Sequence, residues 1–280
     1  MSPASEAKAG PAWHEWFKFA VYGLLMLNVI LFFEDEWDAA SHLFDAGVPL
    51  AEIITAFAAS IDTFAWVVLL LLFELETYQI PDEKLKPPLS TTIHLVRAAC
   101  YGFIVYAFYG YANKVLGLSG YELVQLADIC GLHGHSVLLE LDEYEVLNSG
   151  NCAMLAGEPA LYRLQDAGIL AAPEVWQAAV RLAWVDVVNS ATWLGVVVLL
   201  ELDVRLQIRG ILQGAWRTFS RYAKYLLYSV LFGAAVYWGV HGTFLDFWDA
   251  FLWLVAFVFI EMNIFEWREE LEEAAEPDGR

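Results

Sequence analysis

The segment IDTFAWVVLLLLFELE, residues 61–76, is the most informative part of the chain, because its spacing of polar and aromatic side chains recurs twice further along. The counterparts are VNSATWLGVVVLLELD at 188–203 and WDAFLWLVAFVFIEMN at 248–263. Each segment has an aspartate or asparagine at its second position, a tryptophan four residues later, and a Trp-x7-Glu spacing that ends at a second acidic or amide side chain. Identical spacing in three apolar segments indicates a structural repeat.

A second recurring pattern precedes each of these segments. It consists of a cation, three further residues, a tyrosine and a small residue, and it occurs at Lys18, Tyr22 and Gly23, at Arg97, Tyr101 and Gly102, and at Lys224, Tyr228 and Ser229. One copy of each pattern makes a helical hairpin with two spans, so all three hairpins share one membrane orientation. The sequence therefore predicts an all-α membrane protein of about six transmembrane helices, arranged as three repeated hairpins in a pseudo-threefold bundle.

Composition favours a membrane protein independently of the repeat. The chain is 59% hydrophobic and only 18% charged. Six apolar runs approach the roughly 20 residues that a bilayer requires, at 20–33, 53–73, 98–112, 182–200, 226–240 and 244–260. The predicted organisation is a tail at 1–15, hairpins at 16–76, 93–203 and 220–266, an insertion at 118–173 within the second hairpin, and an acidic tail at 267–280.

The fifteen basic residues predict the orientation. All but Lys114, Arg163 and Arg181 lie with the termini and with the connections at 77–92 and 204–220. The positive-inside rule then places both termini in the cytoplasm, in a multi-pass protein of the cell (inner) membrane. A net charge of -20 argues against nucleic acid as a partner, since that partner requires clustered basic residues.

The insertion at 118–173 is expected outside, as a cap over the outer mouth of the bundle. It contains Cys130 and Cys152, and an oxidising compartment favours a disulfide between them. The alternatives are that both cysteines stay reduced, or that Cys130 binds a metal with His133 and His135.

Acidic side chains inside the apolar runs are the candidate functional residues. Asp62, Asn189 and Asp249 lie about 18 Å from the glutamates that end the same runs, which places them within the hydrocarbon. Asp186 and Asp246 add carboxyl groups one turn further out. Such groups require protons, partners or water, so the set predicts a cation path. Alternatively, each aspartate bonds within its own hairpin, for example to Tyr22, Tyr101 or Tyr228.

The cytoplasmic ends carry matched charges. Glu74, Glu201 and Glu261 are expected at the same depth as Lys18, Arg97 and Lys224. Ion pairs between them would clamp each hairpin, or each hairpin to the next, and a cytoplasmic gate is the alternative. The repeated aromatic residues are expected to pack between helices, with cation-π contact to an ion as the alternative; they are Tyr22, Trp66, Tyr101, Trp193, Tyr228 and Trp253.

These observations predict a cation channel or transporter. The alternative is a non-transporting scaffold or accessory subunit that docks a partner protein. No nucleophile elbow, phosphate loop or zincin motif occurs, so an enzyme is not indicated, although a membrane enzyme with a site assembled from separate helices is a third hypothesis. No cofactor is predicted beyond a bound monovalent or divalent cation or a proton, and the expected partners are the bilayer and either a second copy or another membrane protein.

Overall fold

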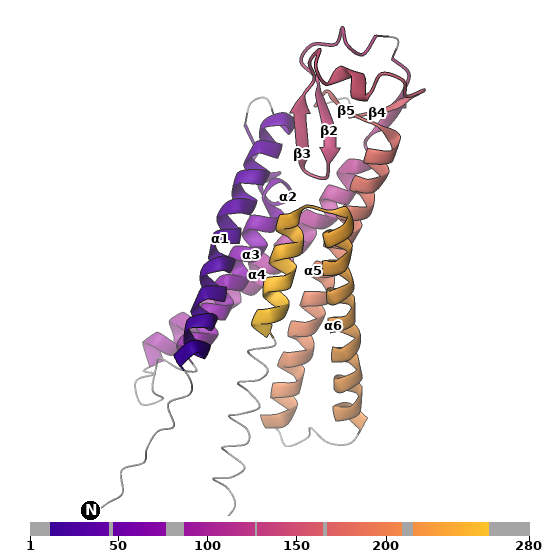
Figure 1. The fold of residues 1–280 in the computed structure, drawn as a ribbon. Coiled ribbons are helices and arrows are strands. Elements are labelled where there is room, and N and C mark those ends of the chain that lie inside the picture. Colours follow the sequence, from indigo (N-terminus) through magenta and orange to yellow (C-terminus); the bar gives the residue numbers. More distant parts are fainter. Residues whose placement is uncertain are drawn as a thin grey trace, which may run out of the picture.

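The fold is a bundle of long helices with a small sheet at one end, called the sheet end below (Figure 1). The computed structural model describes residues 12–44, 47–76, 87–126, 128–164, 167–208 and 215–257. The helices are α1 (Ala12–Leu43), α2 (Ile53–Ala56), α3 (Ala58–Glu74), α4 (Pro87–Leu118), α5 (Pro173–Ile208) and α6 (Ala215–His241), followed by a helix over 244–257.

Four helices in the described ranges are long and apolar enough to cross a membrane. These are Trp16–Leu43, Pro87–Leu118, Pro173–Asp203 and Ala215–His241. Their outer faces carry large exposed apolar side chains such as Leu95, Phe103, Tyr222 and Phe232, which hydrocarbon solvates and water does not. The other two predicted spans correspond to α3, which has 17 residues, and to the helix over 244–257, so a six-span bundle stays a prediction.

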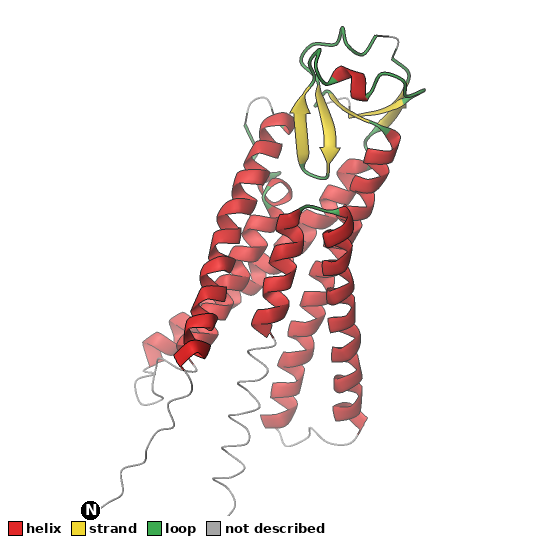
Figure 2. Cartoon of the chain, in the orientation of Figure 1, coloured by secondary structure: helices red, strands yellow, loops and turns green. Residues whose placement is uncertain are grey.

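The prediction of an all-α fold was incomplete, because the insertion forms a five-stranded sheet (Figure 2). The strands are β1 (Glu122–Val124), β2 (Ser136–Glu140), β3 (Glu143–Val146), β4 (Leu161–Leu164) and β5 (Ile169–Ala171). Their order is β1-β4-β5-β2-β3, with β2 and β5 parallel and the other neighbours antiparallel. Strands of three to five residues are too short to show the alternation by which a strand is recognised in a sequence.

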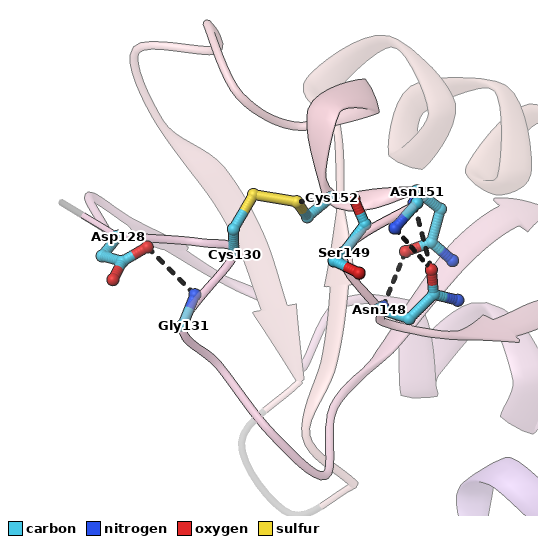
Figure 3. The surroundings of a disulfide bond; sticks show 8 residues. Asp128, Cys130, Gly131, Asn148, Ser149, Asn151 and Cys152 are labelled. Atoms are coloured by element: carbon cyan, nitrogen blue, oxygen red, sulfur yellow. Dashed lines mark hydrogen bonds between the residues drawn. A yellow bond between two sulfur atoms is a disulfide. The ribbon is translucent and has the colours of Figure 1, made fainter.

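The predicted disulfide between Cys130 and Cys152 is confirmed. It joins the segment before β2 to the loop after β3 (Figure 3). That loop is ordered by its own amides, because Asn148 accepts hydrogen bonds from the backbone N–H groups of Gly150 and Asn151 at 2.7 and 3.2 Å. The alternative of reduced or metal-binding cysteines was therefore wrong.

The hairpin of β2 and β3 points from the sheet toward the helices (Figure 1). Its two-residue turn is Leu141–Asp142, and Asp142 has φ +65°, a conformation that glycine or asparagine adopts with less strain. Leu141 packs against an apolar cluster that includes Leu182 of α5 and Trp238 of α6. On the other side, Tyr144 lies against His42 of α1, with ring centroids 5.9 Å apart. The tip of the hairpin thereby lies between α1 on one side and α5 and α6 on the other.

Candidate functional site

A cavity of about 120 Å³ lies between the helices and the tip of the β2–β3 hairpin. Nine carboxyl groups line it: Asp35, Glu36, Asp62, Glu140, Asp142, Glu143, Asp186, Asp246 and Asp249. Within the described ranges, Lys114 is the one basic side chain in its lining. The five residues predicted for an ion path, Asp62, Asp186, Asn189, Asp246 and Asp249, all line this cavity, although they come from three separate helices. We call it the acidic cavity.

Three tryptophans close the acidic cavity on the side away from the sheet. Trp66, Trp193 and Trp253 are all buried, and Trp66 lies 5.7 Å from Trp193 and 6.2 Å from Trp253 between ring centroids. Phe257 contacts all three, at 6.5, 4.5 and 6.5 Å. Aromatic pairs at these separations add attraction beyond the area that they bury. Of the six aromatic residues predicted to pack between helices, the three tryptophans therefore gather around Phe257 and form an apolar floor.

Two aspartates sit just above this floor, each beside a polar group that the sequence analysis did not single out. Asn28 of α1 donates from Nδ2 to Oδ1 of Asp249 at 2.8 Å. The Tyr111 hydroxyl of α4 donates to Oδ2 of Asp62 at 3.5 Å, and Oδ1 of Asp62 is buried with no hydrogen-bond partner in the described part of the chain. Asp62 thus keeps an acceptor that a proton or a cation could satisfy.

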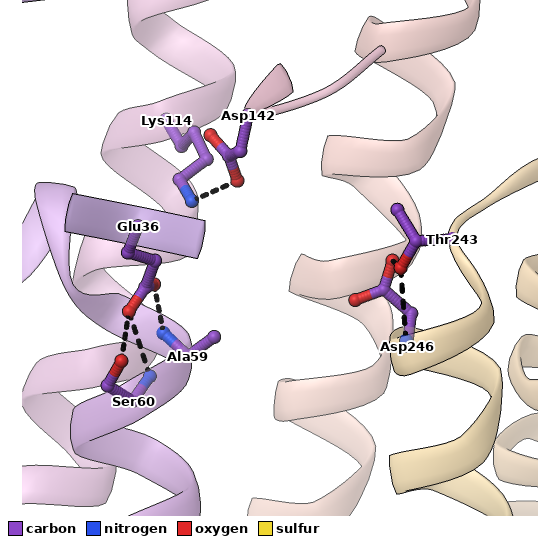
Figure 4. A network of polar contacts seen from close by, with 7 residues as sticks. All are labelled: Glu36, Ala59, Ser60, Lys114, Asp142, Thr243 and Asp246. Atoms are coloured by element: carbon purple, nitrogen blue, oxygen red, sulfur yellow. Dashed lines mark hydrogen bonds and ion pairs between the residues drawn. The ribbon is translucent and has the colours of Figure 1, made fainter. Parts of the chain in front are cut away.

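Glu36 forms one wall of the acidic cavity and caps the start of α3. Oε1 accepts from the Ala59 N–H at 2.7 Å, and Oε2 accepts from the Ser60 N–H at 3.0 Å and from the Ser60 hydroxyl (Figure 4). The first N–H groups of a helix lack partners within the helix, and the positive end of its dipole favours an anion. Glu36 is only 4% exposed, so these contacts are what makes its burial tolerable.

Asp246 lies on the opposite wall, at the start of the helix over 244–257 (Figure 4). Thr243 donates from its hydroxyl to Oδ2 of Asp246 at 2.8 Å and accepts from the Asp246 N–H at 3.2 Å. This reciprocal pair is a variant of the capping box, in which a residue before the helix and the third residue within it satisfy each other. Asp246 therefore has a structural role as well as a place in the cavity.

At the mouth, Lys114 of α4 forms an ion pair with Asp142 in the turn of the β2–β3 hairpin, with 2.6 Å between Nζ and Oδ2. Both side chains are largely shielded, with 13% and 29% exposed. An ion pair in such a place is stronger than one on an open surface, because less water screens it. It joins the insertion to the bundle directly over the cavity.

The opposite end of the bundle carries the predicted ion pairs in a partly different pattern. Lys18 pairs with Glu74, whose second oxygen accepts from the Tyr22 hydroxyl at 3.3 Å. Two further ion pairs join consecutive predicted hairpins, Arg97 with Glu76 and Lys224 with Asp203 at 2.8 Å, whereas the Tyr101 hydroxyl donates to Glu201 of its own predicted hairpin at 3.5 Å. Glu261 lies outside the described residues. Lys224 and Arg97 thus contact the second acidic position of each pattern, two residues beyond the predicted glutamate.

The tyrosines suggested as partners for the buried aspartates have other contacts. The hydroxyl groups of Tyr22 and Tyr101 bond to Glu74 and Glu201 at the far end of the bundle, which is more than two helical turns from Asp62. The tyrosine that does reach Asp62 is Tyr111, whose position in an otherwise apolar run was the available signal.

Sequence reasoning missed other residues of the site for different reasons. Glu36 belongs to the acidic run at 34–38, which resembles a solvated helix end. Asp142 lies in the insertion, and no sequence spacing relates it to Lys114, 28 residues earlier. Both residues reach the cavity only through tertiary contacts.

The weak metal candidates stay apart from the acidic cavity. Cys130 is in the disulfide, and the ring Nδ1 of His135 lies 3.1 Å from the backbone carbonyl oxygen of His133. Within the described ranges, no group of three or more His, Cys, Asp or Glu side chains is arranged to hold a metal ion. Comparison with protein-family models, with curated proteins and with solved structures gives no match for this chain.

Proposed function

We propose that this chain is a multi-pass membrane protein that conducts or transports a cation, and that the acidic cavity is the place where the cation binds. It has six spans in three hairpin repeats, with both termini in the cytoplasm and the sheet outside. The observation that carries the proposal is the charge of the cavity, where nine carboxyl groups surround a single amino group.

This charge imbalance needs compensation. A carboxylate within the hydrocarbon costs at least about 2.5 kcal/mol unless protons, water or counter-ions compensate it. One lysine balances the charge of one carboxylate, and neutral hydrogen-bond donors leave the charge of the others in place, so the cavity as a whole holds protons or attracts cations from solution. Carboxylates that face a shared cavity raise the local cation concentration and replace part of the hydration shell of an ion.

The positions of the repeated residues support the three-hairpin arrangement. Trp66, Trp193 and Trp253 occupy the same position in the three sequence patterns, and at the floor of the cavity Trp66 contacts the other two while Phe257 contacts all three. Ion pairs from Arg97 and Lys224 join each later hairpin to the preceding one. Equivalent residues that contact each other across three copies are what an axis along the membrane normal produces.

The arrangement favours access from the outer side in this conformation. Asp35 and Glu143 line the cavity and are exposed at the sheet end, whereas the buried tryptophans block the path beneath Asp62 and Asp249. The ion pairs at the cytoplasmic ends lie below that block. Passage of a cation therefore requires the tryptophan floor to separate, which describes a transporter or a gated channel.

Flux measurements on the purified full chain in liposomes test the proposal. Wild-type protein is compared with Asp249→Asn and Asp62→Asn for uptake of protons, Na⁺ and K⁺ at matched protein density. We expect at least one cation to enter faster than in protein-free liposomes, and each variant to lower that rate at least about tenfold, corresponding to ~1.4 kcal/mol. Glu145→Gln, an exposed β3 residue outside the cavity lining, is the matched control and should retain the wild-type rate.

The same experiment separates transport from the scaffold alternative. Wild-type protein that is helical by circular dichroism, yet moves none of the three cations, would contradict the transport proposal. Unchanged flux in both aspartate variants would show that the cavity is not on the path. The scaffold alternative instead requires a partner protein that co-purifies in a fixed ratio, and no contact in the described structure identifies one.

A further inference from the structure

Lys114 is the one positive charge that the described chain places in the acidic cavity. It reaches the cavity from the sheet-end half of α4, and its ammonium group lies 2.6 Å from Asp142. Figure 4 shows this group on the same side of the cavity as Glu36, across from Asp246. The charges that act on Lys114 include those of Asp142, Glu36 and Asp186, and Lys114 acts in turn on Asp246. Lys114 therefore contacts one carboxylate and lies within electrostatic range of carboxyl groups from three other elements of the fold.

The chemistry of lysine suits a substitute for a free ion. Its ammonium group is a compact point charge on a flexible four-carbon stem, whereas an arginine would make fixed bidentate contacts. A group of this kind can leave one carboxylate and return to it by rotation of its stem. It resembles a monovalent cation of ammonium size in both charge and hydrogen-bonding capacity.

The partner of Lys114 has a left-handed backbone conformation. Asp142 has φ +65° at the tip of the β2–β3 hairpin, where glycine would be less strained. Glycine has no carboxylate, so it could not pair with Lys114. An aspartate at this position therefore supplies the charge that contacts the lysine, although glycine would have less backbone strain.

We propose that Lys114 is the resident counter-cation of the acidic cavity, and that it determines specificity by competing with a monovalent, ammonium-sized cation for the same carboxylates. This proposal rests on the proposed function, because it names the class of ion that the cavity accepts. In the described conformation the place of that ion is taken by the ammonium group of Lys114. A free cation binds when Lys114 leaves Asp142, and this step also frees the tip of the hairpin from the bundle.

Chemical rescue tests the proposal without any measurement of transport. The Lys114→Met variant of the full chain is purified in detergent, and its unfolding temperature is measured in methylammonium chloride and in choline chloride at equal ionic strength. Methylammonium should occupy the vacated place and donate N–H hydrogen bonds to the carboxylates, whereas the quaternary nitrogen of choline carries no N–H and choline serves as the salt control. We expect methylammonium at ten times its dissociation constant to raise the unfolding temperature of the variant by at least about 3 °C over choline.

Four further proteins make the outcome specific. Wild type and Lys114→Arg keep a resident cation, so their unfolding temperatures should differ by less than about 1 °C between the two salts. Arg205→Met removes a basic residue whose side chain is 71% exposed and which pairs with Glu201 outside the cavity, so it should show no rescue. Lys114→Gln retains a donor for Asp142 and holds the hairpin tip in place, and it should show the same rescue as Lys114→Met.

The proposal is wrong if Lys114→Met and Lys114→Gln unfold at the same temperature in both salts. It is also wrong if neither variant folds at any methylammonium concentration, since the free ion then cannot replace the lysine. Rescue of the Lys114 variants by methylammonium, combined with no cation flux in the liposome assay, would overturn the transport proposal alone. Flux that depends on Asp249 without rescue of the Lys114 variants would overturn the role of Lys114 alone.

Discussion

Replacing Glu36 by glutamine removes a buried charge at the start of α3 and changes little of the side-chain volume. The carboxylate accepts three hydrogen bonds, from the Ala59 N–H, the Ser60 N–H and the Ser60 hydroxyl. A glutamine has one oxygen and one amide nitrogen, so at least one N–H donor would face another donor. The lost charge-assisted bond costs about 1.5–3 kcal/mol, and the others weaken because their acceptor is no longer charged.

Part of this cost is offset, because a neutral side chain is easier to bury than a carboxylate. We therefore expect Glu36→Gln to lower the free energy of unfolding by about 2–3 kcal/mol, which corresponds to a fall of roughly 5–10 °C in unfolding temperature for a chain of this size. Ser60→Ala removes only the hydroxyl contact and should cost about 1 kcal/mol.

Thermal unfolding of the detergent-solubilised chain, followed by circular dichroism at 222 nm, measures both variants. Glu34→Gln is the matched control, because Glu34 is exposed on the same helix and makes none of these contacts. If Glu36→Gln unfolds within about 1 °C of Glu34→Gln, the carboxylate does not cap α3 as an anion, and the reasoning fails.

Three further changes test other parts of the fold. Opening the Cys130–Cys152 bridge, whose partners are 22 residues apart, should lower the stability of the sheet by about 3 kcal/mol through the loss of its loop constraint. Proteolysis of the insertion should become faster while the helicity of the bundle stays unchanged. An unchanged rate of proteolysis would contradict this prediction. Gly110→Ala would place Cβ 2.4 Å from a carbonyl oxygen of α2 and should lower the free energy of unfolding by about 1–3 kcal/mol. Gly102→Ala on the same helix meets open space and should raise the free energy of unfolding by about 0.5–1 kcal/mol. The unfolding temperatures of the two variants should therefore shift in opposite directions. Burial and nearby carboxylates raise the pKa of Glu140 above its ordinary value of 4.5. The folded sheet therefore binds this proton more tightly than the unfolded chain, and it loses stability as the pH rises above that value. Glu140→Gln should reduce the difference in unfolding temperature between about pH 4 and about pH 7, and an unchanged difference would contradict this assignment.

Local patterns were sufficient for much of the site. Asp62 and Asp249 were recognisable because a carboxyl group within an apolar run is costly wherever the helix ends up. Trp66, Trp193 and Trp253 were found by their spacing in the sequence, and Trp66 contacts both of the others in the structure. The sequence also predicted the disulfide, because two of the three cysteines lie in one segment that was expected in an oxidising compartment.

Other features depended on contacts between distant segments. The sheet went unrecognised because its strands are too short for alternation to be visible, and its strand order joins β1 to β4 and β2 to β5. Arg97 and Lys224 contact the second acidic residue of each pattern. The two carboxylates of a pattern are about half a helical turn apart, and side-chain packing determines which of them the basic residue contacts.

The order of residues is enough to show that apolar helices carry carboxyl groups at regular positions, because helical spacing and the cost of burying charge are properties of each segment alone. That these carboxyl groups share one cavity with Glu36, Lys114 and Asp142 follows only from how the helices and the hairpin pack together. The reason is that a charge inside a protein is tolerated through its neighbours, and those neighbours come from α1, α4 and a β-hairpin, whose meeting no local spacing encodes.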